Sequence, residues 1–153
     1  MKLDALNLAI IRHLRDGRKS FKEIAVALSV TENTVRSRVN RLREGGVLDI
    51  AGLIEPDALP GHKLVFMGVK LTGMNLVKKA REFSDLPGVV GVSVVTGRYD
   101  LILQVLIRGD HGLLDFFTEQ LDPISGIQSV ETFVSYKNLH VRVPYVLNPE
   151  EEN

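Results

Sequence analysis

Residues 20–44 read SFKEIAVALSVTENTVRSRVNRLRE, and this stretch decides the fold of the first third of the chain. Ser20 stands three positions before Glu23, the spacing of a capping box, in which each side chain satisfies a backbone N–H of the first helical turn. Thr31 is a favourable N-cap for a second helix. Only residues 29–30 separate the two helices, so the helices must cross at a steep angle. The stretch therefore predicts a helix-turn-helix.

The second of these helices has one apolar and one polar face. Val35, Val39 and Leu42 recur at i, i+4 and i+7, so they form a stripe that packs against the rest of the domain. Gly45 and Gly46 follow the last apolar residue, as is common where a helix ends. The opposite face is rich in arginine and asparagine.

We expect this polar face to meet double-stranded DNA. Arginine and asparagine can make paired hydrogen bonds to guanine and adenine in the major groove, and arginine also neutralises phosphates. The alternative is an ordinary solvated helix face, but the short turn and the capping signals favour a DNA reader. The expected DNA contacts are Thr31, Asn33, Thr34, Arg36, Ser37, Arg38, Asn40 and Arg41.

The formal net charge of zero conceals an asymmetry between the two parts of the chain. Residues 1–50 hold ten Lys/Arg and six Asp/Glu, a net of +4, and residues 51–153 hold nine and thirteen, a net of −4. Basic charge therefore accompanies the helix-turn-helix, as nucleic-acid binding requires. Because +4 is modest, we expect tight binding to need a dimer.

The remainder of the first domain lies on both sides of this motif. Leu6, Ile10 and Leu14 predict an amphipathic first helix. The run VLDIAGLI at residues 47–54 has strand-like residues and predicts a short hairpin or wing packed against the helices. We therefore expect a winged helix-turn-helix domain over residues 1–54, followed by a Pro- and Gly-containing linker over residues 55–63.

The periodicity beyond the linker predicts a second, α+β domain over residues 64–148. Strand-like and helix-like runs alternate in the order β-α-β-β-α-β, the ferredoxin-like pattern. Asp110 is a candidate cap of the second helix. We expect one further strand at residues 139–145, with Pro144 confining it to an edge or a strand end, and a disordered tail at 149–153. The runs of the main pattern are residues 64–71, 75–86, 89–95, 101–107, 110–121 and 127–136.

Two helices on one face of a four-stranded sheet would leave its other face bare. An exposed apolar sheet face is an association surface, and a twofold dimer, sheet against sheet, is its simplest use. Such a dimer would set two recognition helices about one turn of DNA, ~34 Å, apart. Candidates for one side of the sheet or the other are Phe66, Val92, Val94, Leu103 and Val105.

Composition excludes several other classes of protein. There are no cysteines, so we expect neither disulfides nor a thiolate metal site. No apolar run approaches the ~20 residues that span a bilayer, and the N-terminus does not resemble a signal peptide, so a cytoplasmic location without membrane contact is expected. We expect no catalytic site, metal or cofactor, because motifs for these are absent and the four histidines are widely spaced, at His13, His62, His111 and His140.

The chain resembles the leucine-responsive/asparagine regulator (Lrp/AsnC, feast–famine) family of prokaryotic transcription regulators. Three stretches carry the resemblance: LDALNLAIIRHLRDGR at 3–18, EIAVALSVTENTVRSRVNRLREGGVL at 23–48, and TGRYDLILQV at 96–105, which looks like the family's Gly-x-Tyr-Asp turn. Asn7 departs from the acidic residue that the family often shows there, and we expect this to affect local helix packing.

The resemblance implies a C-terminal domain of the RAM or ACT-like type that dimerises and binds an effector, usually an amino acid, between subunits. It also implies assembly into tetramers or octamers. The alternative for the Gly-x-Tyr-Asp turn is a plain hairpin turn, with Tyr99 packed at an interface and Asp100 capping backbone amides. The residues that the resemblance places at the pocket are Gly97, Arg98, Tyr99 and Asp100, with Ser129, Thr132 and Ser135 on the later strand.

Two other functions remain open. Some haem-biosynthesis decarboxylases resemble the same two-domain architecture, with an altered helix-turn-helix and catalytic histidines in the second domain, and fold alone does not fix function. An effector-binding assembly protein that no longer contacts DNA is the other possibility. The cluster of Arg36, Arg38 and Arg41 favours DNA binding over both.

Overall fold

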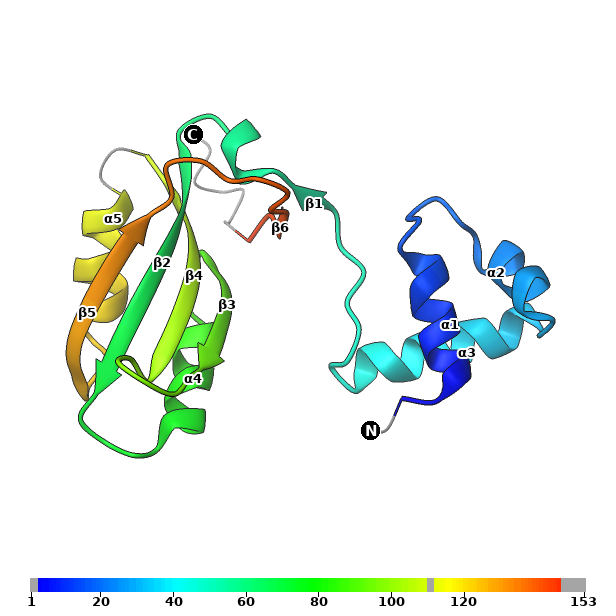
Figure 1. Ribbon diagram of the computed structural model, residues 1–153, viewed down its shortest axis with the longest axis horizontal. Helices are drawn as coiled ribbons and strands as arrows, with labels where there is room; N and C mark the ends of the chain where they lie inside the picture. The colour runs from blue at the N-terminus through cyan, green and yellow to red at the C-terminus, as the bar shows by residue number, and fades with distance from the viewer. Residues whose placement is uncertain (1–2, 110–111, 147–153) are drawn as a thin grey trace. The chain divides into compact units, whose positions relative to one another are not determined.

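The computed structural model describes residues 3–109 and 112–146. The chain divides into two compact units, Met1–Ala51 and Gly52–Asn153 (Figure 1). Among the described residues, no helix has both the length and the apolar character that a membrane span needs.

The first unit contains three helices, α1 (Ala5–Leu14), α2 (Phe21–Leu28) and α3 (Glu32–Glu44). The capping box of α2 is present, with the amide of Ser20 donating to the Glu23 carboxylate at 2.7 Å and the amide of Glu23 donating to Ser20 Oγ at 3.2 Å. Thr31 caps α3 by accepting from the Thr34 amide at 3.1 Å. The helix-turn-helix is therefore confirmed.

The apolar stripe of α3 forms the centre of this unit. Val35, Val39 and Leu42 are buried, and the first two pack with Ile10 of α1 and Ile24 of α2. The turn between α2 and α3 passes through Ser29, whose φ of 54° lies in the left-handed region that glycine prefers. A serine therefore holds the sharp turn on which the crossing of the two helices depends.

The expected wing over residues 47–54 is wrong. Residues 47–52 form no strand, and β1 (Leu53–Ile54) pairs with β6 (Val143–Pro144) inside the second unit. Ile54 packs beside Val143 in an apolar cluster of that unit, whereas Leu48 packs against the core of the helices, so the expected wing is divided between the two units. The first unit accordingly ends at residue 51, and the expected linker contains the short helix η1 (Pro56–Ala58) and the start of the next strand.

The β-α-β-β-α-β order of the second unit is confirmed. Its four strands form one antiparallel sheet in the order β3-β4-β2-β5, and Figure 1 shows α4 and α5 on the same face of it. The expected second helix is mostly a π-helix, and its candidate cap, Asp110, lies outside the described residues. The elements are β2 (His62–Leu71), α4 (Leu76–Ser84), β3 (Val89–Val94), β4 (Leu101–Arg108), α5 (Gly112–Asp115), the π-helix η2 (Phe116–Leu121) and β5 (Ile127–Val134).

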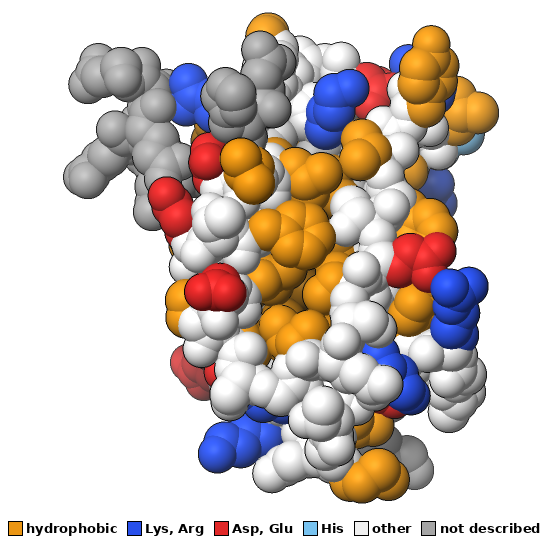
Figure 2. Space-filling view, turned by 90° about the vertical axis from the view of Figure 1, so that its left-hand side faces the viewer, with side chains coloured by type: hydrophobic (Ala, Val, Ile, Leu, Met, Phe, Trp, Pro, Cys, Tyr) orange, Lys and Arg blue, Asp and Glu red, His pale blue; other side chains and the backbone are white. Residues whose placement is uncertain are grey.

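The main core lies between the sheet and its helices. Phe83 of α4 is fully buried against alternate residues of the two central strands, among them Leu103 and Val105. Val92 packs against the same core, whereas Val94 is exposed at the edge strand. Along the side of the unit that bears α5 and β5, hydrophobic side chains gather with charged side chains around them (Figure 2). A shallow hollow between these two elements is lined by Val65, Ile107, Leu113 and Val134.

The helix-free face of the sheet is not bare. A second apolar cluster joins Leu64, Phe66 and Leu106 of the sheet to Ile54 and Val143 of the β1–β6 pair. One end of this face is therefore covered from within the chain, which corrects the expectation of a wholly open surface.

The segment that covers this face after β5 is fixed to η1 by one carboxylate. Asp57 accepts from the backbone amide of Asn138 at 3.0 Å and from its side-chain amide at 2.6 Å, and it pairs with Lys137 at 3.1 Å. Ser135 Oγ donates to Asn138 Oδ1 at 2.8 Å, so the buried side chain of Asn138 is hydrogen-bonded at both ends. These bonds replace most of the strand expected at 139–145, where His140 takes a left-handed φ of 58°. The tail at 149–153 lies outside the described residues.

The Asp57 contacts predict a pH-dependent stability. The amide hydrogen bonds from Asn138, with smaller contributions from Lys137, lower the pKa of Asp57 from 3.8 to about 2. A carboxyl whose pKa is depressed on folding stabilises the protein above its unfolded pKa and loses that effect as pH falls towards the folded pKa. Asp57→Asn should therefore lower the urea midpoint at pH 7, and the gap from the unsubstituted protein should shrink between about pH 4 and pH 2.

Asp122→Asn is the matched control, because Asp122 is an exposed carboxylate of the same unit. It should show no comparable gap at pH 7. If the difference in urea midpoint between Asp57→Asn and the unsubstituted protein stayed constant down to pH 2, the charge of Asp57 would not be the source of the stabilisation.

Candidate DNA interface and effector region

The surface of α3 carries all the residues expected at DNA, with Thr31 at its N-cap. Thr34 and Arg38 are half-buried, and the others are exposed. Two adjoining surface depressions share Asn33, Ser37 and Arg41, so these three side chains stand together. The buried stripe of Val35, Val39 and Leu42 lies on the opposite side of the helix. Because that side packs against the unit, the polar face is turned towards solvent.

Arg36 lies at one border of the exposed face. Its guanidinium pairs with Glu32 one turn earlier at 2.7 Å and lies 5.5 Å from the centre of the Phe21 ring on α2. Cation–π contacts of this kind are worth roughly 0.5–1 kcal/mol at exposed sites. Part of the side chain of Arg36 is therefore used in holding α3 beside α2.

Arg38 lies at the other border and reaches α1. Its Nη1 donates to the Asp4 carboxylate and to Asn7 Oδ1, the latter at 3.2 Å. Asp4 is also the N-cap of α1, accepting from the Asn7 amide at 2.8 Å. That amide bond, followed by the Arg38 hydrogen bond, lowers the pKa of Asp4. Asn7 was predicted to affect helix packing, but the contacts of Asp4 and Asn7 with α3 were not predicted.

Arg41 differs from both of these arginines. Within the described part of the chain, its side chain has no ion-pair or hydrogen-bond partner, and it is exposed. Asn33, Ser37 and Asn40 are exposed beside it. The arrangement offers one uncompensated cation and three neutral polar groups, a set that can hydrogen-bond base edges and a phosphate.

The Gly-x-Tyr-Asp turn connects β3 to β4 at one end of the sheet. Gly97 has a φ of 119°, a conformation that side chains other than glycine rarely adopt. Asp100 accepts from the Leu71 amide at 2.8 Å and from Lys70 Nζ at 2.9 Å, and these bonds, in that order, lower its pKa. In the single chain Asp100 therefore caps a backbone amide, as the alternative in the sequence analysis proposed.

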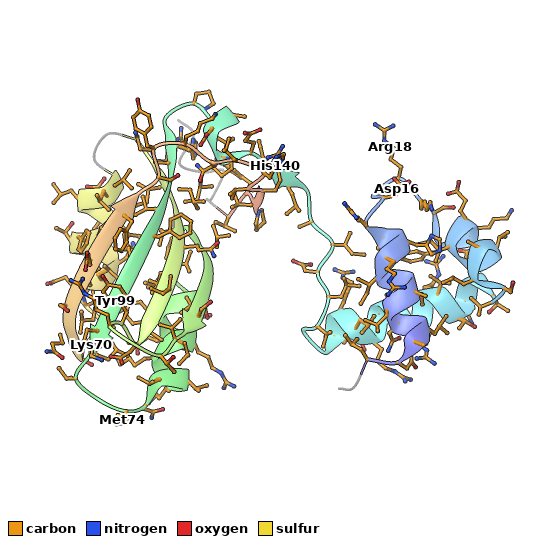
Figure 3. All side chains as sticks on the ribbon, in the orientation of Figure 1. Asp16, Arg18, Lys70, Met74, Tyr99 and His140 are labelled. Carbon is orange, nitrogen blue, oxygen red and sulfur yellow. The ribbon has the colours of Figure 1, made fainter. Side chains whose placement is uncertain are left out.

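Tyr99 folds onto the helix-free face of the sheet. Its hydroxyl donates to Glu131 of β5, and its ring meets Phe133 edge-on, with 6.5 Å between ring centres. Arg98 pairs with Glu131 at 2.9 Å. The hydrogen bond to Glu131 is the largest cause that raises the pKa of Tyr99. Figure 3 shows Tyr99 and Lys70 at the same end of the sheet.

Strand register separates the three β5 residues that the resemblance placed at the pocket. Ser129 pairs with Lys70 and lies on the same face as Glu131, whereas Thr132 pairs with the core residue Met67 and faces the helices. Ser135 lies beyond β5 and is bonded to Asn138. Ser129 therefore shares a face with Tyr99, Thr132 lies on the opposite face, and Ser135 is engaged with the segment that covers the helix-free face. Glu131 was not among the predicted residues; its signal in the sequence is a carboxylate between Val130 and Phe133 in the strand-like run at 127–136.

Within the described residues, no three or more side chains of His, Cys, Asp or Glu gather in a way that could hold a metal ion.

Comparison with known families identifies both units. The model of the AsnC-type helix-turn-helix domain matches residues 3–43, and that of the Lrp/AsnC ligand binding domain matches residues 64–144. A helix-turn-helix-type transcriptional regulator of Pyrococcus abyssi is 37% identical over 136 residues, which cover 88% of this chain and 86% of that protein. The regulatory protein AsnC of Haemophilus influenzae is 28% identical over 142 residues, covering 89% and 93%.

Solved structures share the fold. E. coli AsnC matches with a TM-score of 0.64 and 24% identity, covering 90% of this chain and 95% of its own. A transcriptional regulator of Neisseria meningitidis, solved as a complex with L-Met, matches with a TM-score of 0.67 and 18% identity, covering 99% and 100%. At these identities the structural matches show the common fold alone.

The position of Tyr99 predicts a strict requirement for glycine at position 68. A Cβ added at Gly68 would lie 2.7 Å from ring atoms of Tyr99, closer than packed atoms tolerate. Gly68→Ala should therefore cost about 1–3 kcal/mol of unfolding free energy, as overpacking does, measured by urea denaturation. Gly91→Ala is the matched control, because a Cβ there meets nothing within 4 Å.

The same substitution made in a Tyr99→Ala variant shows whether the cost comes from the clash with the ring or from a general inability of β2 to accept a side chain at position 68. Removing the ring should make the further change Gly68→Ala nearly neutral, since two residues in contact are coupled. Equal costs of Gly68→Ala with and without Tyr99 would show that the ring is not the obstacle.

Proposed function

The chain belongs to the Lrp/AsnC family of transcription regulators, and from this premise we propose that it reads double-stranded DNA with α3 as an oligomer under the control of an amino acid. The two family models match in the order of a reading head followed by a ligand-binding domain. The observation that carries the proposal is the exposed polar face of α3, fixed outward by its buried stripe.

The DNA-facing surface that we propose is centred on Asn33, Ser37, Asn40 and Arg41. All four are exposed on one side of the helix, and their functional groups suit base edges and phosphates. Thr31, Thr34 and Arg36 flank this centre. The net charge of +4 in residues 1–50 supports the same assignment.

A dimer is the simplest assembly that would use the rest of the helix-free sheet face. Phe133 is 47% exposed there, and Phe66 and Ile102 are half-buried. Apolar residues on an incompletely covered sheet favour association with a second copy. Assembly into tetramers or octamers is proposed by analogy with the family.

The effector that we propose is an amino acid bound near the turn at residues 97–100. Arg98 and Glu131 offer opposite charges 2.9 Å apart, and Lys70 and Asp100 form a second pair at the same end of the sheet. A zwitterion carries one charge of each sign, so it can exchange with such pairs. The relative from Neisseria meningitidis was solved with L-Met, which supports the ligand class.

An enzymatic role has less support. The relatives are regulators, and the intact polar face of α3 distinguishes this chain from decarboxylases of similar architecture. We therefore propose that the chain is not an enzyme and acts on DNA in the cytoplasm.

DNA binding can be tested with a duplex selected from a random pool. Arg41→Ala should weaken binding to the selected duplex and reduce the slope of log K against log salt by about 0.9, as expected for one lost phosphate contact, measured by fluorescence anisotropy at several salt concentrations. Arg81→Ala, which removes an exposed arginine from α4 of the second unit, should leave affinity nearly unchanged. Equal losses in the two variants would mean that Arg41 contributes only general charge.

The effector can be sought by thermal denaturation with each of the twenty amino acids. A ligand at a hundred times its Kd stabilises the native state by about 2.7 kcal/mol, a rise in Tm of roughly 5–10 °C for a chain of this size. Arg98→Ala should remove that rise while leaving the Tm without ligand nearly unchanged, because Arg98 is 77% exposed. A rise that persists in Arg98→Ala would place the ligand elsewhere.

A further inference from the structure

We propose that Arg38 is a positioning residue, which holds the recognition helix against α1, and that the reading of DNA falls to the residues around Arg41. This inference rests on the proposed DNA binding. It assigns different roles to arginines of α3 that the sequence alone does not distinguish. It concerns how α3 is oriented within its own unit.

Arg38 lies at the edge of the buried stripe of its helix. A residue advances about 100° around an α-helix, so Arg38, next to Val39 and three residues after Val35, borders the buried stripe. Ser37 and Asn33 lie near the middle of the opposite face. Arg38 is accordingly only 33% exposed in its side chain, and its guanidinium points towards α1 rather than away from the unit.

The guanidinium of Arg38 is bound by two partners, Asn7 and Asp4. Asn7 is 5% exposed, and its Oδ1 accepts from Arg38 at 3.2 Å. A buried carbonyl oxygen that loses its donor is costly, so Arg38 satisfies a group that water does not reach. Asp4 accepts from the same guanidinium nitrogen, which compensates the charge. A cation already paired within the protein has less to gain from a phosphate.

Asp4 bonds to both α1 and α3. One carboxylate oxygen caps α1 by accepting from the Asn7 amide at 2.8 Å, and the other takes Arg38 of α3. The start of α1 and the flank of the recognition helix are therefore joined through a single side chain. Small rotations of α3 would break this junction, so it restrains the direction in which Ser37 and Arg41 project.

Two substitutions on opposite sides of the junction test the assignment in the full-length chain. Arg41→Gln should reduce the slope of log K against log salt by about 0.9, the value for one lost phosphate contact. Arg38→Gln should leave that slope unchanged, yet weaken binding to the selected duplex by roughly threefold to tenfold. An equal loss of slope in both variants would overturn the proposal, since Arg38 would then be a phosphate contact.

Asp4→Asn supplies the second, independent readout. Asparagine caps helices as well as aspartate does, so the unit should fold, and the change removes negative charge, which by itself favours DNA binding. If Asp4 positions Arg38, Asp4→Asn should nevertheless weaken binding by several fold and add nothing to Arg38→Gln in the double variant. Asp16→Asn is the control, because Asp16 lies just beyond α1 and its carboxylate accepts from the backbone amide of Arg18 (Figure 3).

Each outcome of the second test is decisive. Binding by Asp4→Asn as tight as that by Asp16→Asn would overturn the positioning role. Failure of the unsubstituted protein to select any duplex would instead refute the proposed DNA binding itself, and the two failures are therefore distinguishable.

Discussion

Strand β2 is buried on both of its faces, and the arrangement of the second unit follows from that burial. Val65, Met67 and Val69 face the helices, while Leu64 lies under the β1–β6 pair. On the same side, Gly68 lies beneath the ring of Tyr99. A strand with two apolar faces requires two covers, so the chain must return over the sheet after β5, and the turn before β4 must fold down onto it.

Local interactions explain which parts of the fold could be predicted from the sequence. The caps at Ser20 and Thr31 act within three or four residues, and they gave the helix-turn-helix correctly. The β1–β6 pair joins residues 89 and 91 positions apart, Ile54 with Val143 and Leu53 with Pro144, with two residues on each side, so no periodicity marks it, and the wing was predicted in its place. The run LVFMGV at 64–69 does carry the signal of two-sided burial, since it lacks polar alternation.

The candidate site divides in the same way. The exposed polar face of α3 can be predicted from the sequence, because amphipathicity is a property of that helix alone. The sequence alone cannot rank Arg36, Arg38 and Arg41 as DNA contacts. The partners that distinguish them, Phe21 for Arg36 and Asp4 and Asn7 for Arg38, lie in or at the start of other helices. In the second unit, Glu131 and Ser129 reach the Tyr99 face through strand register, and Thr132 is turned away by the same register. Proposals for individual effector contacts depend on such tertiary detail.

The pairing of β1 with β6 also sets the length of the linker between the two units. Between the end of α3 and the start of β1 lie only the eight residues 45–52. Leu48 among them packs against the core of the first unit, so the free connection is shorter than the roughly 26–29 Å that eight extended residues span. In an assembly of two copies, binding of one helix-turn-helix to DNA would keep the other within reach of the linkers. The effective concentration of the second helix-turn-helix at a neighbouring half-site would then be on the order of millimolar, as for a short flexible linker. Two half-sites that lie farther apart than the linkers can span would lose this gain in affinity entirely. In such an assembly, the pairing near the C-terminus would thereby limit which spacings of DNA sites the protein could use.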